Sequence, residues 1–208
     1  MDRTSNYPLF LLGTVLLPSE QTMLRVFEER YRDLAARCVE NDEPFGFVMI
    51  EDSGAPSEYG CATRITEVVK RYDDGQLDVL VTGEAPIRLV ELEQLFTYPS
   101  AIVEAVADAP EEPGDAEQAT RTRTAFLRLI DALGVELPDE LKPDRLGSYE
   151  MAALLDLNRH DKQALLELRD EGDRMSLLEK IFGDAATTAA ATRKLSDIAQ
   201  SNGHGRKH

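Results

Sequence analysis

The spacing of hydrophobic residues changes near residue 108, from a two-residue period to a helical one. Leu77, Val79 and Val81 fall at every second position, which is the pattern of a strand with one buried face. The Asp74-Gly75 pair ahead of them favours a hairpin turn, because glycine adopts positive φ without strain. We therefore predict at least five strands in the first half of the chain, over residues 45–50, 61–70, 77–81, 87–89 and 102–106.

One helix is expected to interrupt these strands. Within residues 28–41, apolar side chains recur three and four positions apart, so they share one face of a helix. These residues are Tyr31, Leu34, Ala35, Cys38 and Val39. Because Cys38 lies on the apolar stripe, we interpret it as a buried structural thiol rather than a nucleophile.

The second half of the chain has a helical pattern throughout. Residues 108–117 hold five acids, two prolines and no base, which indicates a linker. Beyond it, we predict helices over 119–133, 149–157, 162–168, 175–182 and 185–200, with Asp184 capping the last of them.

These patterns together predict an α+β protein. We expect a β-rich module over residues 1–107, an acidic linker over 108–117, an all-helical bundle over 118–200 and a disordered tail over 201–208. The last helix is rich in alanine and carries a narrow apolar stripe, formed by Ala186, Ala190, Leu195 and Ile198. The stripe could pack against a second copy of the chain, giving a homo-oligomer, or against its own bundle, and the sequence leaves both open.

The net charge narrows the range of partners. The chain of 208 residues has 23 Lys and Arg against 39 Asp and Glu, giving a formal charge of −16. Such a surface repels phosphate backbones and anionic lipids, so nucleic-acid and membrane binding are disfavoured. The acidity, with arginine outnumbering lysine, fits either a cytosol of high salt or a GC-rich genome.

Cysteine usage and the lack of targeting signals indicate a cytoplasmic protein. Cys38 and Cys61 are isolated and show no C-x-x-C spacing, which fits a reducing compartment. Residues 9–17 resemble the core of a signal peptide, but the charges ahead of them cancel and no cleavage motif follows. Moreover, no apolar run approaches the roughly 20 residues that a membrane span needs.

A search for catalytic and cofactor-binding motifs gives no candidates. The chain lacks the Walker A, G-x-G-x-x-G and G-x-S-x-G motifs. His204 and His208 have a ligand-like spacing but lie in a glycine-containing polar tail, and His160 lies at a helix start, where capping is expected. Asp73, Asp74 and Asp78 lack the rest of a calcium loop. We therefore predict no catalytic residue, no metal and no cofactor.

Several motifs, in order, resemble the Lon protease N-terminal domain family. Residues 8–18 and 24–32 resemble the family's opening pattern P-L-F-P-L-x-x-V-x-x-P followed by F-E-x-R-Y, with Leu11 where the family often has proline. Further similar segments follow at residues 45–48, 60–65, 74–83, 87–89 and 98–99, and in the helical half at 154–157, 161–167 and 174–178.

The resemblance covers roughly residues 7–182 and carries definite implications. It implies a PUA-like β pseudo-barrel joined to a helical bundle, in which the module recognises protein substrates. In full Lon proteases an ATPase module and a Ser–Lys peptidase domain follow. Since this chain ends at His208, we expect a stand-alone, non-catalytic relative of the substrate-binding region.

The first functional hypothesis is a module that binds unfolded or exposed polypeptide segments, or a partner protein, in an apolar groove or along an open strand edge. Its candidate residues are Phe27, Arg30 and Tyr31, together with Arg64 and Arg88, which could hold a peptide carboxylate. The alternatives are that Phe27 and Tyr31 belong to the core and that the arginines form salt bridges.

Two further hypotheses come from other functional classes. A PUA-like fold could bind RNA, which would need a contiguous basic face despite the charge of −16. A hydrolase acting through carboxylates would need a pocket in which one carboxyl has a raised pKa.

Overall fold

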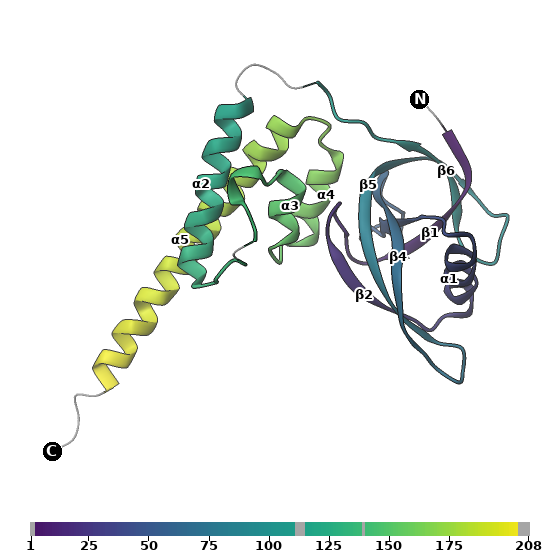
Figure 1. Cartoon of the computed structure of the whole chain (residues 1–208), viewed down its shortest axis with the longest axis horizontal. Coiled ribbons are helices and arrows are strands. Elements are labelled where there is room, and N and C mark those ends of the chain that lie inside the picture. The colour runs from purple at the N-terminus through teal and green to yellow at the C-terminus, as the bar shows by residue number, and fades with distance from the viewer. Residues whose placement is uncertain (1–2, 111–114, 139, 204–208) are drawn as a thin grey trace. The chain divides into compact units, whose positions relative to one another are not determined.

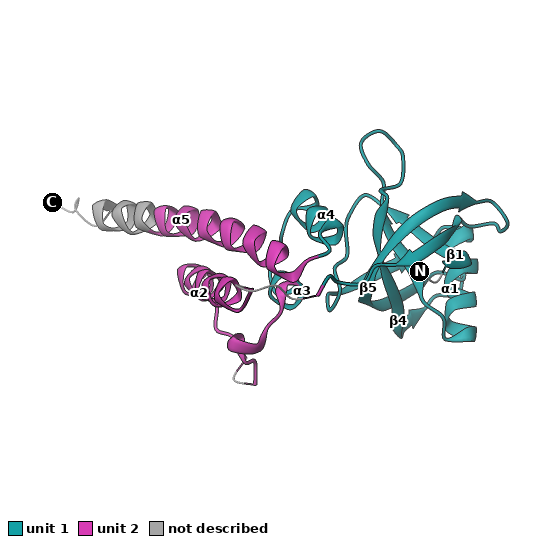
Figure 2. Cartoon of the chain, turned by 90° about the horizontal axis from the view of Figure 1, so that it is seen from above, with its two compact units in different colours: residues 1–109, 149–169 teal, residues 110–148, 170–208 magenta. Residues whose placement is uncertain are grey.

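The computed structural model describes residues 3–110, 115–138 and 140–203, with side chains described up to residue 193 (Figure 1). Its contacts divide the chain into two compact units (Figure 2). Unit 1 comprises Met1–Ala109 and Tyr149–Arg169, and unit 2 comprises Pro110–Ser148 and Asp170–His208. Residues 149–169, expected in the bundle with the rest of 118–200, thus lie in the unit that contains the sheet.

Unit 1 is built on one six-stranded sheet, which confirms the α+β class. Its strands are β1 (Arg3–Leu12), β2 (Gln21–Val26), β3 (Phe45–Met49), β4 (Tyr59–Arg71), β5 (Leu77–Glu93) and β6 (Ser100–Ala105). They follow the order β2-β5-β4-β3-β1-β6, and β5 also pairs with β6. This last pairing closes β5, β4, β3, β1 and β6 into a ring, and β2 is added beside the first half of β5.

The strand predictions are partly right. Residues 45–50, 61–70 and 102–106 correspond to β3, β4 and β6, whereas the two candidates at 77–81 and 87–89 belong to the single strand β5. Neither β1 nor β2 was among the predicted strands. The run of residues 9–12 in β1 lacks alternation because both faces of that strand contact apolar clusters: Leu9 belongs to one and Phe10 to the other.

Because of a β-bulge, β5 contributes buried side chains to both clusters. Thr63 pairs with Gly83 and Ala62 with Ala85, so Glu84 is an extra residue without a partner in β4. In a regular strand, residues 81 and 87 would share a face, but Val81 packs in the cluster with α1 and Ile87 in the other. The inserted residue reverses the face that each later side chain presents.

Helix α1 (Glu29–Asn41) covers one of these clusters, as its apolar stripe predicts. Tyr31, Leu34, Ala35 and Cys38 are buried there, while Val39 at the edge of the stripe is exposed. The helix ends at Asp42, whose φ of 51° is left-handed and whose N–H donates to the carbonyl of Cys38.

Helix α4 (Arg159–Glu167) belongs to unit 1 through the segment that resembles the family's K-Q-x-L-L-E pattern. Lys162 forms a largely buried ion pair with Glu20, and the Gln163 amide donates to the carbonyl of Tyr59 over 3.1 Å. Leu165 and Leu166 are fully buried. The preceding helix α3 (Ser148–Ala153) is shorter than the predicted 149–157.

Unit 2 pairs α2 (Asp115–Leu133) with α5 (Glu171–Gly203), beside the short 3₁₀ turn η1 (Pro143–Arg145). Phe126 and Phe182 meet between the helices, with ring centroids 5.6 Å apart. The predicted helix break at Asp184 is wrong, because α5 continues through this residue. The sequence of α5 contains no proline that would end the helix there. Residues 204–208 of the predicted tail lie outside the described residues.

One polar network is buried in unit 2. Arg174, which is 1% exposed, donates to Ser148 Oγ over 2.9 Å and to Glu171 Oε2 over 2.7 Å. Glu171 in turn accepts from the backbone N–H of Ser148.

Among the described helices of the whole chain, none is both long and apolar enough to cross a membrane.

Candidate functional site

A depression of about 460 Å³ lies in unit 1 where β5 turns back into β6. We call it the turn groove. Its walls come from the end of β1, the first turn of α1 and the turn that joins β5 to β6. The lining residues are Leu11, Arg30, Pro56, Leu92, Glu93, Gln94, Phe96, Thr97, Tyr98, Pro99 and Ser100.

Exposed apolar side chains are concentrated at this turn. Leu92 and Phe96 are 53% and 43% exposed, and the neighbouring Leu95 is 64% exposed. The pairing of Glu93 with Ser100 joins the ends of the two strands, so residues 94–99 form the connection between them. Large apolar groups that remain this accessible side by side are typical of surfaces that bind a partner.

The aromatic part of the turn groove is held in place from behind. The rings of Phe96 and Tyr98 are stacked with centroids 5.0 Å apart, and the Arg37 guanidinium lies 5.0 Å from the Phe96 ring. Arg37 also donates to the Tyr98 hydroxyl over 3.0 Å and pairs with Glu43. Phe96 is therefore a preorganised contact, which loses little side-chain freedom when a ligand binds.

Of the predicted site residues, Arg30 lies at the rim of the turn groove and Tyr31 is buried next to it. Arg30 lines the turn groove, pairs with Glu28 over 2.8 Å and lies 4.5 Å from the Tyr31 ring centroid. Tyr31 itself is buried and stacked on Phe10, and its hydroxyl exchanges hydrogen bonds with the backbone of Leu11. Burial raises the pKa of the Tyr31 hydroxyl, so it remains a donor.

The other predicted residues lie elsewhere. Phe27 is 60% exposed just after β2 and does not line the turn groove. Arg64 on β4 pairs with Glu84 at 2.7 Å and with Asp42 at 3.0 Å. Arg88 on β5 pairs with Glu58 and Glu104.

The Arg88 guanidinium lies 2.7 Å from Glu58 and 3.4 Å from Glu104. Hydrogen bonds to Glu84 and Glu58, respectively, raise the pKa values of Arg64 and Arg88. Both guanidinium groups are thus already neutralised by neighbouring acids, which is the arrangement that the salt-bridge alternative describes.

Sequence reasoning missed the turn residues Leu92, Leu95 and Phe96, and the supporting Arg37. A signal was present, since residues 95 and 96 form an apolar pair between the polar residues Gln94 and Thr97, just ahead of Tyr98-Pro99. Such a pair fits neither the strand period nor the helical one. The signal gains its meaning only from the end of β5 at residue 93, which no local pattern indicates.

The thiol and carboxyl groups that could act in catalysis are placed in structural roles. Burial raises the pKa of Cys38 and of Cys61 to about 12, so both remain thiols at neutral pH. The pKa of Glu104 is held below its ordinary value by a hydrogen bond from Arg3, the opposite of what a general acid needs. In the described part of the chain, no three His, Cys, Asp or Glu residues group as metal ligands.

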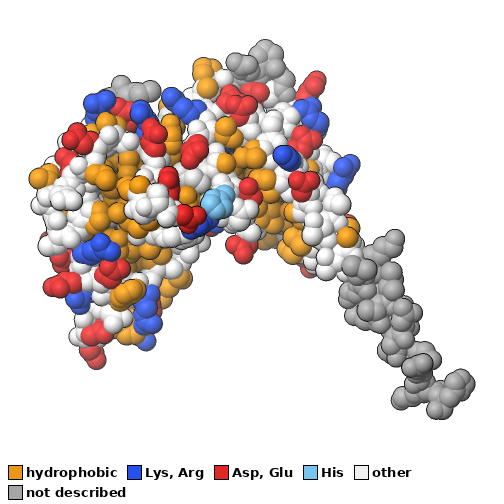
Figure 3. All heavy atoms as spheres, turned by 180° about the vertical axis from the view of Figure 1, so that it is seen from behind, with side chains coloured by type: hydrophobic (Ala, Val, Ile, Leu, Met, Phe, Trp, Pro, Cys, Tyr) orange, Lys and Arg blue, Asp and Glu red, His pale blue; other side chains and the backbone are white. Residues whose placement is uncertain are grey.

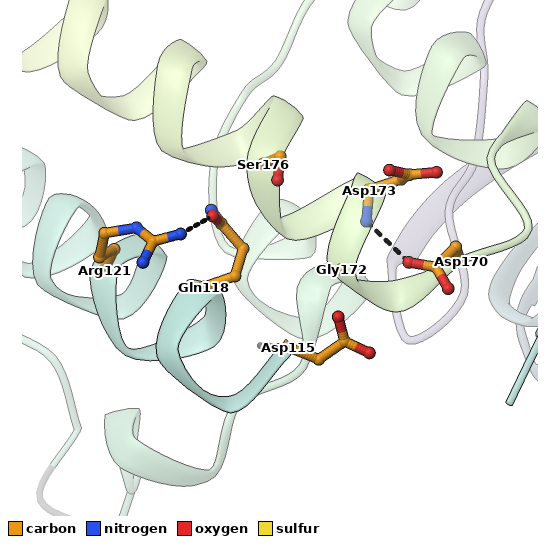
Figure 4. Close-up of a pocket in the computed structure, with 7 residues that line it drawn as sticks. All are labelled: Asp115, Gln118, Arg121, Asp170, Gly172, Asp173 and Ser176. Carbon is orange, nitrogen blue, oxygen red and sulfur yellow. Dashed lines mark hydrogen bonds between the residues drawn. The ribbon is translucent and has the colours of Figure 1, made fainter. Parts of the chain in front are cut away.

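A second depression of about 460 Å³ lies within unit 2, between the first turns of α2 and α5 (Figure 4). Its lining is polar: Asp115, Gln118, Arg121, Asp170, Gly172, Asp173 and Ser176. Asp170 accepts a hydrogen bond from the backbone N–H of Asp173, and Gln118 accepts one from Arg121. These side chains satisfy helix ends and one another, so we assign the depression no ligand.

The distribution of charge does not provide a basic surface on the face drawn in Figure 3. There, Lys and Arg side chains are dispersed among Asp and Glu, with hydrophobic side chains between them. Duplex or single-stranded nucleic acid gains its affinity from clustered cations. This face therefore offers no electrostatic footprint for a phosphate backbone.

Comparisons with known proteins agree with the fold. The model of the ATP-dependent protease La (LON) substrate-binding domain matches residues 6–182. Lon protease 2 of Myxococcus xanthus is 28% identical over 188 residues, which are 83% of this chain and 22% of that protein. The chain thus spans about a fifth of the length of this curated relative.

Two solved structures are also similar. The Lon N-terminal domain protein from Xanthomonas campestris has a TM-score of 0.59 at 28% identity, covering 86% of this chain and 97% of that one. The N-terminal domain of Mycobacterium avium complex Lon protease has a TM-score of 0.70 at 17% identity, covering 88% and 99%. At 17% identity, the second likeness concerns the fold alone.

Proposed function

The chain belongs to the ATP-dependent protease La (LON) substrate-binding domain family, and from this premise we propose that it binds exposed or unfolded polypeptide segments in the turn groove. The observation that carries the proposal is the set of accessible apolar side chains around Phe96, fixed by Tyr98 and Arg37. Binding without chemistry is the role proposed for this chain.

The turn groove suits an apolar segment of a client polypeptide. About half of the Leu92 side chain is exposed, and burying a whole leucine is worth about 1.5–3 kcal/mol, so covering its exposed half contributes about 1 kcal/mol. Phe96 contributes a similar amount. A few such contacts give weak, reversible capture, which suits a module that samples many sequences.

Among the predicted residues, Arg30 contacts the bound segment directly, as a cation at the rim that is paired with Glu28. Tyr31 acts from beneath, because its hydroxyl fixes the backbone of Leu11 in the groove wall. Phe27 is proposed as a separate exposed contact. For Arg64 and Arg88, holding a peptide carboxylate would require that carboxylate to replace Glu84 or Glu58.

The partners proposed are therefore proteins. RNA binding is not favoured, since Arg64 and Arg88 are already paired and the net charge is −16. Self-association stays a prediction. Of the stripe expected to mediate it, Ala186 and Ala190 lie on the described part of α5, while the side chains of Leu195 and Ile198 lie outside the described residues.

Fluorescence anisotropy with a labelled, reduced and carboxymethylated polypeptide tests the proposal. Leu92→Ala and Phe96→Ala are each expected to weaken binding about fivefold, the equivalent of about 1 kcal/mol. Leu133→Ala is the matched control, because Leu133 is 50% exposed on α2 and is not one of the residues that line the groove. Equal affinities for all three variants and the unmodified chain would contradict the proposal.

A further inference from the structure

Strand β2 lies at the end of the strand order and pairs, among the described strands, with β5 alone. Its other edge is therefore a row of backbone groups without a neighbouring strand. Exposed edges are commonly protected by proline, by a bulge or by charged side chains, lysine above all. Residues 21–26 contain no proline, their register with β5 is regular, and the one charged residue, Arg25, is paired with Asp78.

The hydrogen bonds of β5 identify which residues of β2 face outward. The N–H of Gly83 donates to Glu20 and its carbonyl accepts from Ser19, each over 2.9 Å, so the backbone of Gly83 points toward β2. Antiparallel pairing alternates this direction at every residue. With Gln21 opposite Thr82, it follows that residues 22, 24 and 26 bond to β5, whereas 21, 23 and 25 present N–H and C=O groups outward.

Side chains along this edge favour an extended ligand. Met23 is 51% exposed, and Phe27, four residues further on, is 60% exposed. Their spacing is a multiple of the two-residue period of a strand, so both can contact alternate side chains of a chain laid beside β2. Leu24, in contrast, is turned toward the buried cluster with α1.

Charge decides between the possible occupants. A second copy would bring another chain of −16 to an edge on a chain of −16, and like charges oppose that approach. A segment with lysine or arginine between apolar residues is instead attracted. Resting on the proposed function, we propose that the outer edge of β2 adds an extended apolar and basic segment of a client polypeptide as a further strand.

A synthetic peptide with alternating valine or isoleucine and lysine is the probe. Met23→Pro removes one outward N–H and places a ring at the edge, yet breaks no bond to β5, because the Met23 N–H faces away. Met23→Ala removes the same side chain and keeps the N–H. We expect Met23→Pro to raise the Kd about tenfold relative to Met23→Ala, with urea unfolding and circular dichroism establishing that both variants are folded.

Amide exchange and a second peptide sharpen the test. In the unmodified chain, the peptide should slow exchange of the amide protons of residues 21, 23 and 25 and leave those of residues 22, 24 and 26 unchanged. A peptide with glutamate in place of lysine should bind at least about tenfold more weakly. Equal binding by the two folded Met23 variants, or equal binding of the two peptides, would overturn the inference.

The groove variant separates this inference from the proposed function. If Phe96→Ala weakens capture of the carboxymethylated polypeptide while Met23→Pro changes neither ligand, the function stands and the strand-addition site falls. If sedimentation shows that the unmodified chain dimerises and Met23→Pro makes it monomeric, with no peptide binding, the occupant is a second copy and the inference also falls.

Discussion

Gly83 offers a sharp test of how β5 packs, through the substitution Gly83→Ala. A Cβ built on this residue would lie 2.1 Å from the Leu17 carbonyl oxygen, 2.9 Å from the Leu17 carbonyl carbon and 3.0 Å from Cys61 Sγ. The first two atoms belong to the backbone, so no side-chain rotation relieves the contact. Leu17 is itself fully buried, and the loop behind it is fixed by the two hydrogen bonds that Gly83 makes to Ser19 and Glu20.

The expected cost follows from these contacts. Overpacking typically costs about 1–3 kcal/mol, and displacing the loop would also strain two hydrogen bonds worth about 1 kcal/mol each. A loss of about 3 kcal/mol is therefore expected for Gly83→Ala. With urea slopes of about 1–3 kcal/mol per molar, the unfolding midpoint should fall by about 1–3 M.

Gly13→Ala provides the matched control. A Cβ at Gly13 meets nothing within 4 Å, and the residue has no positive φ. The control should change stability by less than about 0.5 kcal/mol. The assay is urea unfolding followed by circular dichroism and by tyrosine fluorescence, since the chain has no tryptophan. Equal midpoints for the two variants would refute the packing described for Gly83.

Two further predictions concern titratable groups. Because burial raises the pKa of Cys38 and Cys61 to about 12, neither thiol should react with iodoacetamide at pH 8 in the folded chain, and both should react in urea; rapid native labelling, read by mass spectrometry, would contradict their burial. The pKa of Glu104 is lowered from 4.5, chiefly by the hydrogen bond from Arg3, so the contribution of this carboxylate to folding stability is present above pH 4.5 and is lost as pH falls through the lowered value. Glu104→Gln should therefore flatten the loss of stability below pH 4.5. Unchanged acid unfolding curves would argue against the pairing of Glu104 with Arg3.

Local patterns in the sequence were enough to predict α1 and most strands. The stripe of Tyr31, Leu34, Ala35 and Cys38 corresponds to the buried face of α1. The turn at Asp74-Gly75 joins β4 to β5, where Gly75 has a φ of 84°. In each case the residues that determine the element lie within a few positions of one another, so their spacing carries the information.

Features that depend on distant partners were not predicted. β1 has no alternation because apolar clusters contact both of its faces, and the separate candidates at 77–81 and 87–89 join through the bulge at Glu84. For the candidate site, Arg30 and Tyr31 could be named from the family resemblance. The groove around Phe96, however, depends on β6 returning to pair with β5, which no local pattern encodes.

The chain leaves unit 1 at residue 109 and returns to it at residue 149. Consequently, α4 is held in unit 1 by non-covalent bonds and not by a short chain connection. Lys162 forms an ion pair with Glu20, the Gln163 amide donates to the carbonyl of Tyr59, and the N–H of Ala109 donates to the carbonyl of Arg169. A single proteolytic nick between residues 134 and 142 would leave these bonds intact. The two fragments should then remain associated as a non-covalent complex. A polypeptide that stops at residue 109 should likewise gain folding stability when residues 149–169 are added as a separate peptide.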